Sequence, residues 1–215
     1  MGRLDLVWFC TVVAVSTCAV LAASCTNMPS DDVGLGVSRP ATFGLGQVTG
    51  HVPPSVDGLR SVVTLDPHVS IDVPVPSELA VMNQYGRDFI PRFLVVREGQ
   101  TVQFRNSEDE LHTVKLSDAT GQVIFNIGMP ILGGTYEHTF EQAGQYGVRC
   151  DSHQEMVARI VVVSSPYAVI ADRNGAFSFS DIPVGSYTAT VRKRLDQLEW
   201  VVDIEAGANT LILDR

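Results

Sequence analysis

The sequence has little cysteine, few aromatic residues and a deficit of positive charge. Its 215 residues include 15 Lys and Arg against 24 Asp and Glu, for a formal net charge of −9. Nucleic acids and anionic membrane surfaces bind basic faces, so this balance argues against both as partners. Helical spacing of apolar residues is also missing, apart from one possible short helix around Val75–Tyr85. Hydrophobic residues nevertheless make up 45% of the chain, which is ample for a folded core.

Three of the four cysteines, Cys10, Cys18 and Cys25, lie in an N-terminal targeting segment. An apolar run, Leu6–Leu21, follows a short polar start and ends in small residues before Cys25. This run is shorter than the about 20 residues that a membrane-spanning helix needs. Because it ends in small residues, we expect residues 1–25 to be a cleaved signal peptide; a signal anchor is the alternative. Leu21–Cys25 also resembles a bacterial lipoprotein box, which predicts a lipid on Cys25, although ordinary signal peptidase could cut the same bond.

Cleavage of this segment changes the cysteine inventory. Cys10 and Cys18 leave with the signal peptide, and lipidation of Cys25 leaves Cys150 without a disulfide partner in an oxidising compartment. If Cys25 were not lipidated, a Cys25–Cys150 disulfide would be the alternative. Residues 26–43 are polar and rich in Gly and Pro, which predicts a flexible tether. We therefore expect a protein of the bacterial periplasm or cell surface, attached to the membrane only through a lipid on Cys25.

Short strand-like runs, separated by turn signals such as Asn174-Gly175, fill the rest of the chain. Many short strands at this spacing predict an all-β fold, either a sandwich or a barrel. The predicted strands are Gly46–Val52, Ser61–Leu65, Phe93–Arg97, Thr101–Arg105, Leu111–Leu116, Thr135–Phe140, Gly144–Cys150, Val157–Val163, Tyr167–Ala171, Ala176–Phe179, Ser186–Arg192, Leu198–Glu205 and Thr210–Leu213.

One loop between two of these strands contains an informative group of side chains. Cys150, His153 and Met156 have the spacing Cys-x-x-His-x-x-Met, and a short loop can direct three such donors towards one point. His112, further upstream, is a candidate for a second imidazole. A thiolate, two imidazoles and a thioether suit copper in both oxidation states, and His₂Cys with a weak axial Met is the ligand set of a blue-copper site.

Other chemistries explain this group less well. Zinc would more usually recruit further Cys or His, or a carboxylate with water. A Cys–His nucleophile would need an orienting group and an oxyanion hole, and an iron–sulfur cluster would need more Cys than the sequence has. Taken singly, Cys150 would be a small buried apolar residue and Met156 would fill the core. We find no catalytic set and expect a protein that is not an enzyme.

The segments around the candidate ligands resemble the cupredoxin family. Val102–Val114 resembles the strand that delivers the first His, with Asn106 and Asp109 at the usual Asn and Asp positions, and Phe140–Cys150 resembles the strand that leads to the Cys. This resemblance implies a Greek-key β-sandwich over residues 71–165 that holds one type 1 copper ion. The implied ligands are His112, Cys150 and His153 in the equatorial positions and Met156 in the axial position.

The resemblance also implies a carrier of single electrons that acts through the exposed edge of His153. Two positions depart from the family's usual loop, because Gln154 replaces a Pro and Glu155 replaces an aromatic residue. Acidic residues crowd this end of the predicted sandwich, so we expect a basic redox partner such as a cationic cytochrome c. They are Glu108, Asp109, Glu110, Asp151 and Glu155. The alternatives are a copper-binding or copper-delivery protein without electron transfer, and an adhesion module with vestigial ligands.

The C-terminal segment Ala168–Lys193 resembles a carboxypeptidase-regulatory-like sandwich, with the pattern Asp-x-Asn-Gly-x-Phe-x-Phe followed by Asp-Ile-Pro-x-Gly-x-Tyr. The opening strands of such a domain are missing just before Ala168, and matching runs appear far upstream, at Gly46–Val52 and Ser61–Leu65. We therefore predict that the cupredoxin is inserted into a small sandwich built from residues 44–70 plus 166–215. This second sandwich is expected to be a scaffold or a docking module.

Overall fold

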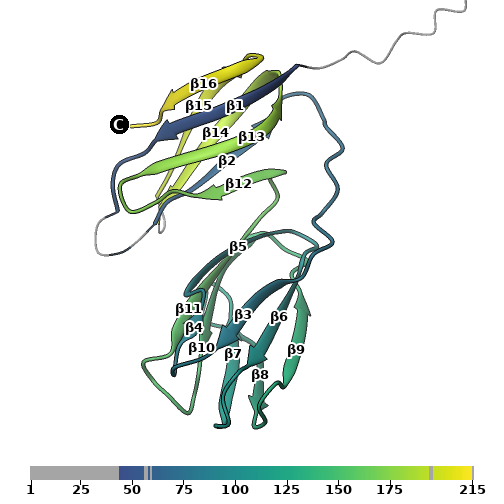
Figure 1. Ribbon diagram of the computed structural model, residues 1–215, viewed down its shortest axis with the longest axis vertical. Coiled ribbons are helices and arrows are strands. Elements are labelled where there is room, and N and C mark those ends of the chain that lie inside the picture. Colours follow the sequence, from purple (N-terminus) through teal and green to yellow (C-terminus); the bar gives the residue numbers. More distant parts are fainter. Residues whose placement is uncertain (1–43, 56–57, 59, 194–195, 215) are drawn as a thin grey trace, which may run out of the picture. The chain divides into compact units, whose positions relative to one another are not determined.

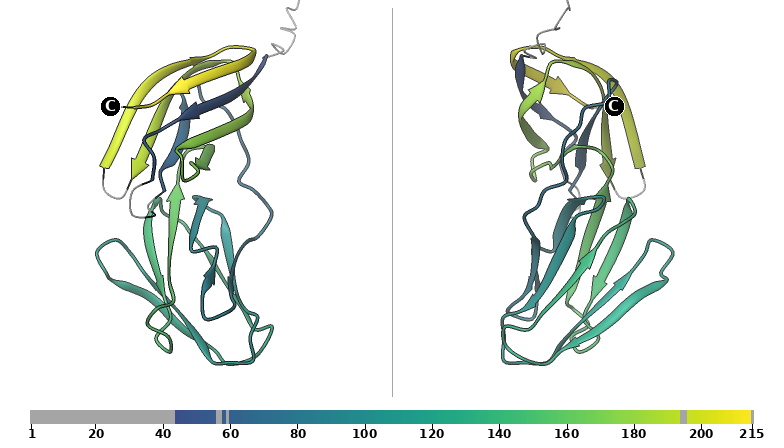
Figure 2. Two further views of the ribbon diagram at one scale, coloured as in Figure 1. Left: turned by 60° about the vertical axis from the view of Figure 1, so that its left-hand side comes forward. Right: turned by 90° about the vertical axis from the view of Figure 1, so that its right-hand side faces the viewer.

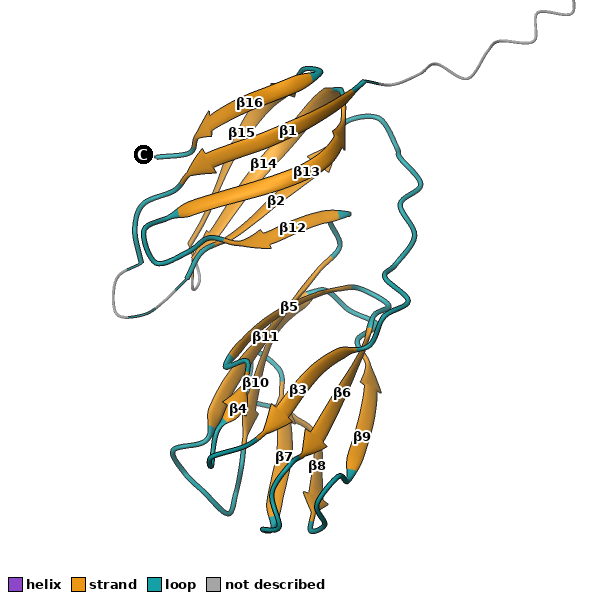
Figure 3. Cartoon of the chain, in the orientation of Figure 1, coloured by secondary structure: helices purple, strands orange, loops and turns teal. Residues whose placement is uncertain are grey.

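The computed structural model describes residues 44–55, 58, 60–193 and 196–214, and the predicted signal peptide and tether lie outside these residues. The described residues form sixteen strands in four sheets (Figures 1 and 3). Helices are absent from these residues, so no described helix is long and apolar enough to cross a membrane. The all-β expectation is confirmed, and the strands of each sandwich run in two layers (Figure 2).

The first sandwich is formed by the middle of the chain and contains two sheets, ordered β4-β3-β6-β9 and β5-β11-β10-β7-β8. Its core lies between these sheets and includes Phe89, Phe104 and Phe140. The strands are β3 (Ala80–Gln84), β4 (Phe89–Ile90), β5 (Phe93–Arg97), β6 (Thr101–Asn106), β7 (His112–Ser117), β8 (Val123–Met129), β9 (Thr135–Thr139), β10 (Gly144–Arg149) and β11 (Val157–Val163).

Alternation of buried and exposed side chains explains why these segments are strands. In β7, His112, Val114 and Leu116 are buried, while the residues between them are half-buried. In β6, Val102 and Phe104 are buried in the same core. A period of two residues places every second side chain on one face of a sheet, so each strand delivers one apolar face to the core.

The second sandwich contains two sheets, ordered β13-β1-β16 and β12-β2-β14-β15. Val48, Leu65, Phe177 and Tyr187 belong to its core. The strands are β1 (Leu45–His51), β2 (Val62–Pro67), β12 (Tyr167–Ile170), β13 (Ala176–Pro183), β14 (Gly185–Lys193), β15 (Asp196–Ile204) and β16 (Gly207–Ile212).

The order of the strands in the second sandwich differs from their order in the sequence. β1 pairs with β13 and β16, and β2 pairs with β12 and β14, so both early strands pair with strands that follow β11. The chain therefore leaves this sandwich after β2 and returns to it at β12. The insertion hypothesis predicts pairing of this kind. The domain boundaries and the resemblance to a carboxypeptidase-regulatory-like domain stay predictions.

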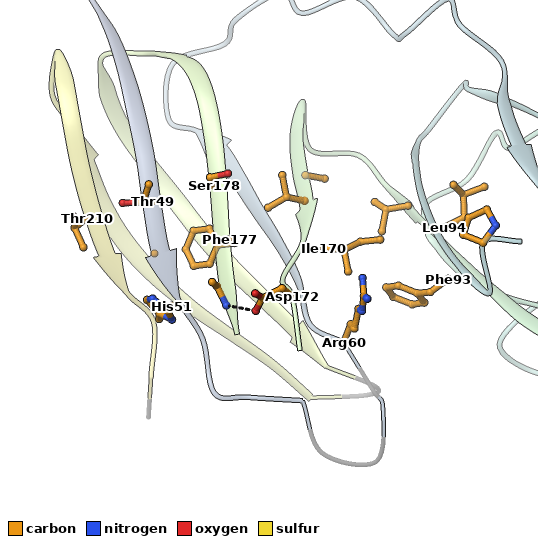
Figure 4. Close-up of a pocket in the computed structure, with 16 residues that line it drawn as sticks. Thr49, His51, Arg60, Phe93, Leu94, Ile170, Asp172, Phe177, Ser178 and Thr210 are labelled. Carbon is orange, nitrogen blue, oxygen red and sulfur yellow. Dashed lines mark hydrogen bonds between the residues drawn. The ribbon is translucent and has the colours of Figure 1, made fainter. Parts of the chain in front are cut away.

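The turn between β12 and β13 has a purely structural explanation. Asp172 Oδ1 accepts hydrogen bonds from the backbone nitrogens of Asn174 and Ala176, at 2.8 Å each. Figure 4 draws the bond at Asp172 to Ala176 as a dashed line. Gly175 has a φ of +87°, and a Cβ at this position would lie 2.0 Å from Val52 O. An Asx turn followed by a glycine in the left-handed region therefore accounts for Asp172 and Asn174 without a bound cation.

The possible helix around Val75–Tyr85 is wrong. The end of this segment forms β3, which pairs in parallel with β6 from Ala80 opposite Val102 to Gln84 opposite Asn106. Met82 and Gln84 are buried in β3, which is the period of a strand, and pairing with β6 outweighs the weak helical spacing. β8 was not predicted, because Asn126 and Gly128 interrupt its apolar residues on an edge of the sheet.

Candidate metal centre

Three of the four predicted ligands meet at one end of the first sandwich. His112 begins β7, Cys150 directly follows β10, and His153 lies in the loop before β11. β7 and β10 are antiparallel neighbours, with Arg149 opposite Lys115, so the start of β7 lies beside the end of β10. One potential ligand atom from each of the three residues lies within 4.8 Å of the others.

The loop that carries Cys150 and His153 closes on Met156. Met156 N donates to His153 O at 3.1 Å, and Cys150 N donates to Met156 O at 3.2 Å. Met156 is fully buried and belongs to the same core cluster as Cys150. The structure thus brings His112, Cys150 and His153 together. It buries Met156 at the end of the loop that carries Cys150 and His153. The roles of all four residues as ligands stay predictions.

In each of the two imidazoles Nε2 contacts a carboxylate, which leaves Nδ1 as the nitrogen that could bind a metal ion. His112 Nε2 lies 3.1 Å from Glu108 Oε2, whereas its buried Nδ1 has no hydrogen-bond partner. His153 Nε2 lies 3.0 Å from Glu110 Oε1, and its Nδ1 faces Cys150 Sγ at 3.7 Å. A buried nitrogen without a partner is destabilising unless a ligand binds it. The 3.7 Å separation also suits an ion about 2.0–2.3 Å from each donor.

The sulfur of Cys150 is held by the residue that follows His112. Thr113 N lies 3.4 Å from Cys150 Sγ, and Thr113 Oγ1 lies 3.7 Å from it. Burial opposes ionisation of this thiol, but the Thr113 backbone, the His112 imidazole, the Thr113 hydroxyl and His153 outweigh burial and lower the pKa of Cys150 to about 6. The thiolate is the form that binds metals. A soft thiolate beside two imidazole nitrogens therefore fits a copper ion.

A buried amide organises the loop that precedes His112. Asn106 Nδ2 donates to Glu110 O and Met129 O at 2.9 Å each, and its Oδ1 accepts from Glu108 N at 2.9 Å. Asn106 is fully buried, so these three bonds satisfy its amide away from water. The loop that supplies Glu108 and Glu110 is therefore fixed from its interior.

Sequence reasoning missed the roles of four residues at this end. It treated Glu108 and Glu110 as surface charges, although each contacts an imidazole, and it did not include Arg87 or Thr113. The i,i+4 spacing of Glu108 and His112 was an available signal. For Arg87 there was none, because its contact with Glu110 depends on the folding of β3 and β4 against β6. Hydrogen bonds from Arg87 are the main cause that lowers the pKa of Glu110.

Residues 78–163 match the family model described as copper binding proteins of the plastocyanin/azurin family. This stretch is a cupredoxin domain. Solved structures similar to the chain include a purple cupredoxin from Nitrosopumilus maritimus, with 27% identity over 39% of this chain and 99% of that one, at a TM-score of 0.35. Another is amicyanin from Paracoccus versutus, with 21% identity over 47% of this chain and 97% of that one, at a TM-score of 0.37.

A copper-containing nitrite reductase from Thermus scotoductus is also similar, with 23% identity over 46% of this chain and 25% of that one, at a TM-score of 0.36. A search of curated proteins found no match. The family model leaves the strands of the second sandwich, before residue 78 and after residue 163, outside its match.

Proposed function

We propose that the cupredoxin domain is a type 1 copper site that carries single electrons between redox partners outside the cytoplasm. The observation that supports this most strongly is the convergence of the Cys150 thiol with two imidazoles, one of which has a buried and unpaired Nδ1. When bound, a copper ion supplies the one-electron change between Cu(I) and Cu(II). His112, Cys150 and His153 would hold it, with Met156 as the weak axial ligand.

The protein's own contribution is a rigid and dry set of donors. Cys150 and Met156 are 3% and 0% exposed, so water has little access to the sulfur atoms. Two hydrogen-bond donors on Thr113 hold Sγ, and two carboxylates hold the outer nitrogens of the imidazoles. Because these contacts come from strands packed around one core, the donors keep their positions in both oxidation states, which favours fast electron transfer.

The partner, the location and the absence of catalysis are further parts of the proposal. Asp109, Asp151 and Glu155 are exposed at the metal end, which supports docking of a basic redox protein such as a cationic cytochrome c. The lipoprotein-like Leu21–Cys25 supports export and a lipid anchor. We propose a carrier rather than an enzyme, because the Cys150 thiol and the two nearby imidazoles are assigned to one copper ion.

The proposal can be tested by adding Cu(II) to the purified, metal-free protein. We expect an intense visible charge-transfer band from thiolate to copper, which is absent in Cys150→Ser and unchanged in the control His51→Gln, an exposed histidine of β1. The copper-loaded protein should then accept and return one electron with a cationic cytochrome c, more slowly at high salt. Weak and colourless binding would favour copper delivery, and no binding would overturn the assignment.

A further inference from the structure

Arg87 occupies an unusual backbone position in the turn that joins β3 to β4. Gly86 and Arg87 have φ values of +66° and +53°, and Tyr85 N donates to Asp88 O at 3.1 Å across the turn. Two consecutive left-handed residues form the turn that suits a β-hairpin, but a long side chain is disfavoured there. The exposed end of the hairpin therefore carries an arginine in a backbone conformation that costs conformational free energy.

Arg87 contacts both of the carboxylates that hold the imidazoles. Its backbone N donates to Glu108 Oε2 at 3.1 Å, and the same oxygen contacts His112 Nε2. Its guanidinium donates to both oxygens of Glu110, from Nε at 3.2 Å and from Nη2 at 3.0 Å. Glu110 Oε1 in turn contacts His153 Nε2 at 3.0 Å. Arg87 thus holds Glu108, which contacts Nε2 of His112, and Glu110, which contacts Nε2 of His153.

Stability alone does not account for this arrangement. The side chains of Arg87 and Glu110 are 59% and 36% exposed, and an ion pair this exposed to solvent contributes little to stability. A bidentate pair does, however, fix the direction of a carboxylate. A carboxylate that accepts the N–H of a ligating histidine fixes its tautomer and its ring orientation and makes the other nitrogen a stronger donor.

We propose that Glu110 and Arg87 are positioning residues that orient His153 towards Cys150 and stabilise the site with Cu(II) relative to the site with Cu(I). Glu110 keeps the proton of His153 on Nε2, so that Nδ1 faces Cys150 Sγ, and its negative charge favours the ion of higher charge. Arg87 keeps both oxygens of Glu110 in place. This inference rests on the proposed type 1 copper function and adds the residues that control its second histidine.

The first experiment uses the metal-free protein and does not depend on copper. Long-range ¹H–¹⁵N NMR correlations, recorded at a pH where the imidazoles are neutral, report which nitrogen of His153 carries the proton. Every protein compared also carries Cys150→Ala, because a Cys150 thiolate would itself accept the proton from Nδ1. We expect a single Nε2–H tautomer in the unchanged protein and in the control Glu155→Ala, which removes a nearby exposed carboxylate. We expect both tautomers to be populated in Glu110→Ala. In Arg87→Lys we expect a smaller share of the Nδ1–H tautomer, because lysine keeps the positive charge but cannot donate to both oxygens of Glu110 in the same geometry. An unchanged tautomer in Glu110→Ala would overturn the proposal.

The second experiment compares reduction potentials of the copper-loaded protein. Glu110→Gln and Glu155→Gln remove the same charge from the same end, but only Glu110 contacts an imidazole. We expect Glu110→Gln to raise the potential at least about twice as much as Glu155→Gln, because Coulomb interactions weaken with distance and with solvent between the charges. Equal shifts would contradict the proposal.

The two arms separate this inference from the function on which it rests. If the unchanged protein shows no charge-transfer band, the type 1 assignment fails, and the tautomer measurement still decides whether Glu110 positions His153. If the band is present but neither the tautomer nor the potential responds specifically to Glu110, the assignment stands and this inference fails. Thermal unfolding of each variant checks that Glu110→Gln and Arg87→Lys are folded.

Discussion

The two sandwiches have similar apolar cores but bury different polar groups. The cupredoxin sandwich buries Gln84, Asn106 and His112 at its metal end, whereas the second sandwich buries the small hydroxyl residues Ser61, Thr64 and Thr190. Within the described residues, every buried side-chain nitrogen or oxygen atom without a hydrogen-bond partner belongs to a residue from 84 to 112. These atoms are Gln84 Oε1, Arg97 Nε and His112 Nδ1. One sandwich is thus satisfied by its own contacts, and the other keeps an unsatisfied nitrogen beside its thiol.

The second sandwich uses its most buried polar ring for structure alone. Tyr187 is 1% exposed, and its hydroxyl donates to Pro183 O at 2.7 Å, which ties β14 to the end of β13. At the metal end of the cupredoxin domain, the buried polar ring of His112 has only one of its two nitrogens occupied. The same burial of a polar ring stabilises one sandwich and prepares the other for a ligand.

The largest effects should come from a matched pair of core truncations. Leu116→Ala in β7 and Leu65→Ala in β2 each remove a fully buried leucine, so each should lower the free energy of unfolding by about 2–5 kcal/mol. Only Leu116 lies on the strand that begins at His112, so only Leu116→Ala should also weaken copper binding. Chemical denaturation and copper titration measure the two effects. Equal loss of copper affinity in both variants would show that the sandwiches do not act separately.

The next effect concerns Tyr187. Tyr187→Phe leaves Pro183 O without its donor and should destabilise the protein by about 1–3 kcal/mol, with no change in the copper spectrum. Burial raises the pKa of Tyr187 to about 12, above the value of about 10 in an unfolded chain. This contribution is therefore complete below pH about 10 and is lost as the pH rises towards 12.

The difference in stability between the unchanged protein and Tyr187→Phe should consequently shrink above pH about 10. Urea unfolding of both proteins at several pH values measures it, and taking the difference removes the contribution of every other titrating group. A constant difference up to the highest pH at which the protein folds would contradict the prediction.

A smaller effect of opposite sign is expected at the metal end. His112→Leu removes the buried, unpaired Nδ1 and replaces the ring by an apolar side chain, so the metal-free protein should be unchanged or more stable by about 1 kcal/mol. Copper binding should be lost at the same time. Thermal unfolding without metal, with His51→Gln as the control, tests this trade between stability and function. A strongly destabilised His112→Leu would show that His112 is chiefly structural.

The smallest effect is expected from Thr113. Thr113→Val removes the hydroxyl that lies 3.7 Å from Cys150 Sγ and accepts from Asp151 N at 2.6 Å, but it keeps the backbone N–H that lies 3.4 Å from the sulfur. Copper should still bind, with a shifted charge-transfer band and a change in stability below about 1 kcal/mol. Thr113→Ser keeps the hydroxyl and should restore the original spectrum. A complete loss of the band in Thr113→Val would mean that the hydroxyl, through the sulfur or through Asp151 N, is required to hold the ligand loop.

Much of the local structure was predictable from short-range patterns. Alternating apolar residues identified most of the strands, and Asn174-Gly175 identified a turn, because period and turn chemistry depend on neighbouring residues. The strand β3 and the edge strand β8 could not be predicted in this way, because their pairing partners rather than their own residues decide their conformation. The grouping of Cys150 with His153 followed from a spacing of three residues. His112 was a candidate for the second imidazole from its residue type, and its place in the ligand set followed from a family resemblance.

The sequence by itself determined the donor types, their spacing in one loop, the acidic balance and the strand-rich character of the chain. Only the tertiary structure decided which nitrogen of each histidine is available, because that depends on where Glu108 and Glu110 lie. It also decided that Arg87, from a distant turn, anchors both carboxylates. Side-chain chemistry is local and can be read from residue types, whereas the partner of each polar atom depends on contacts between segments far apart in the chain.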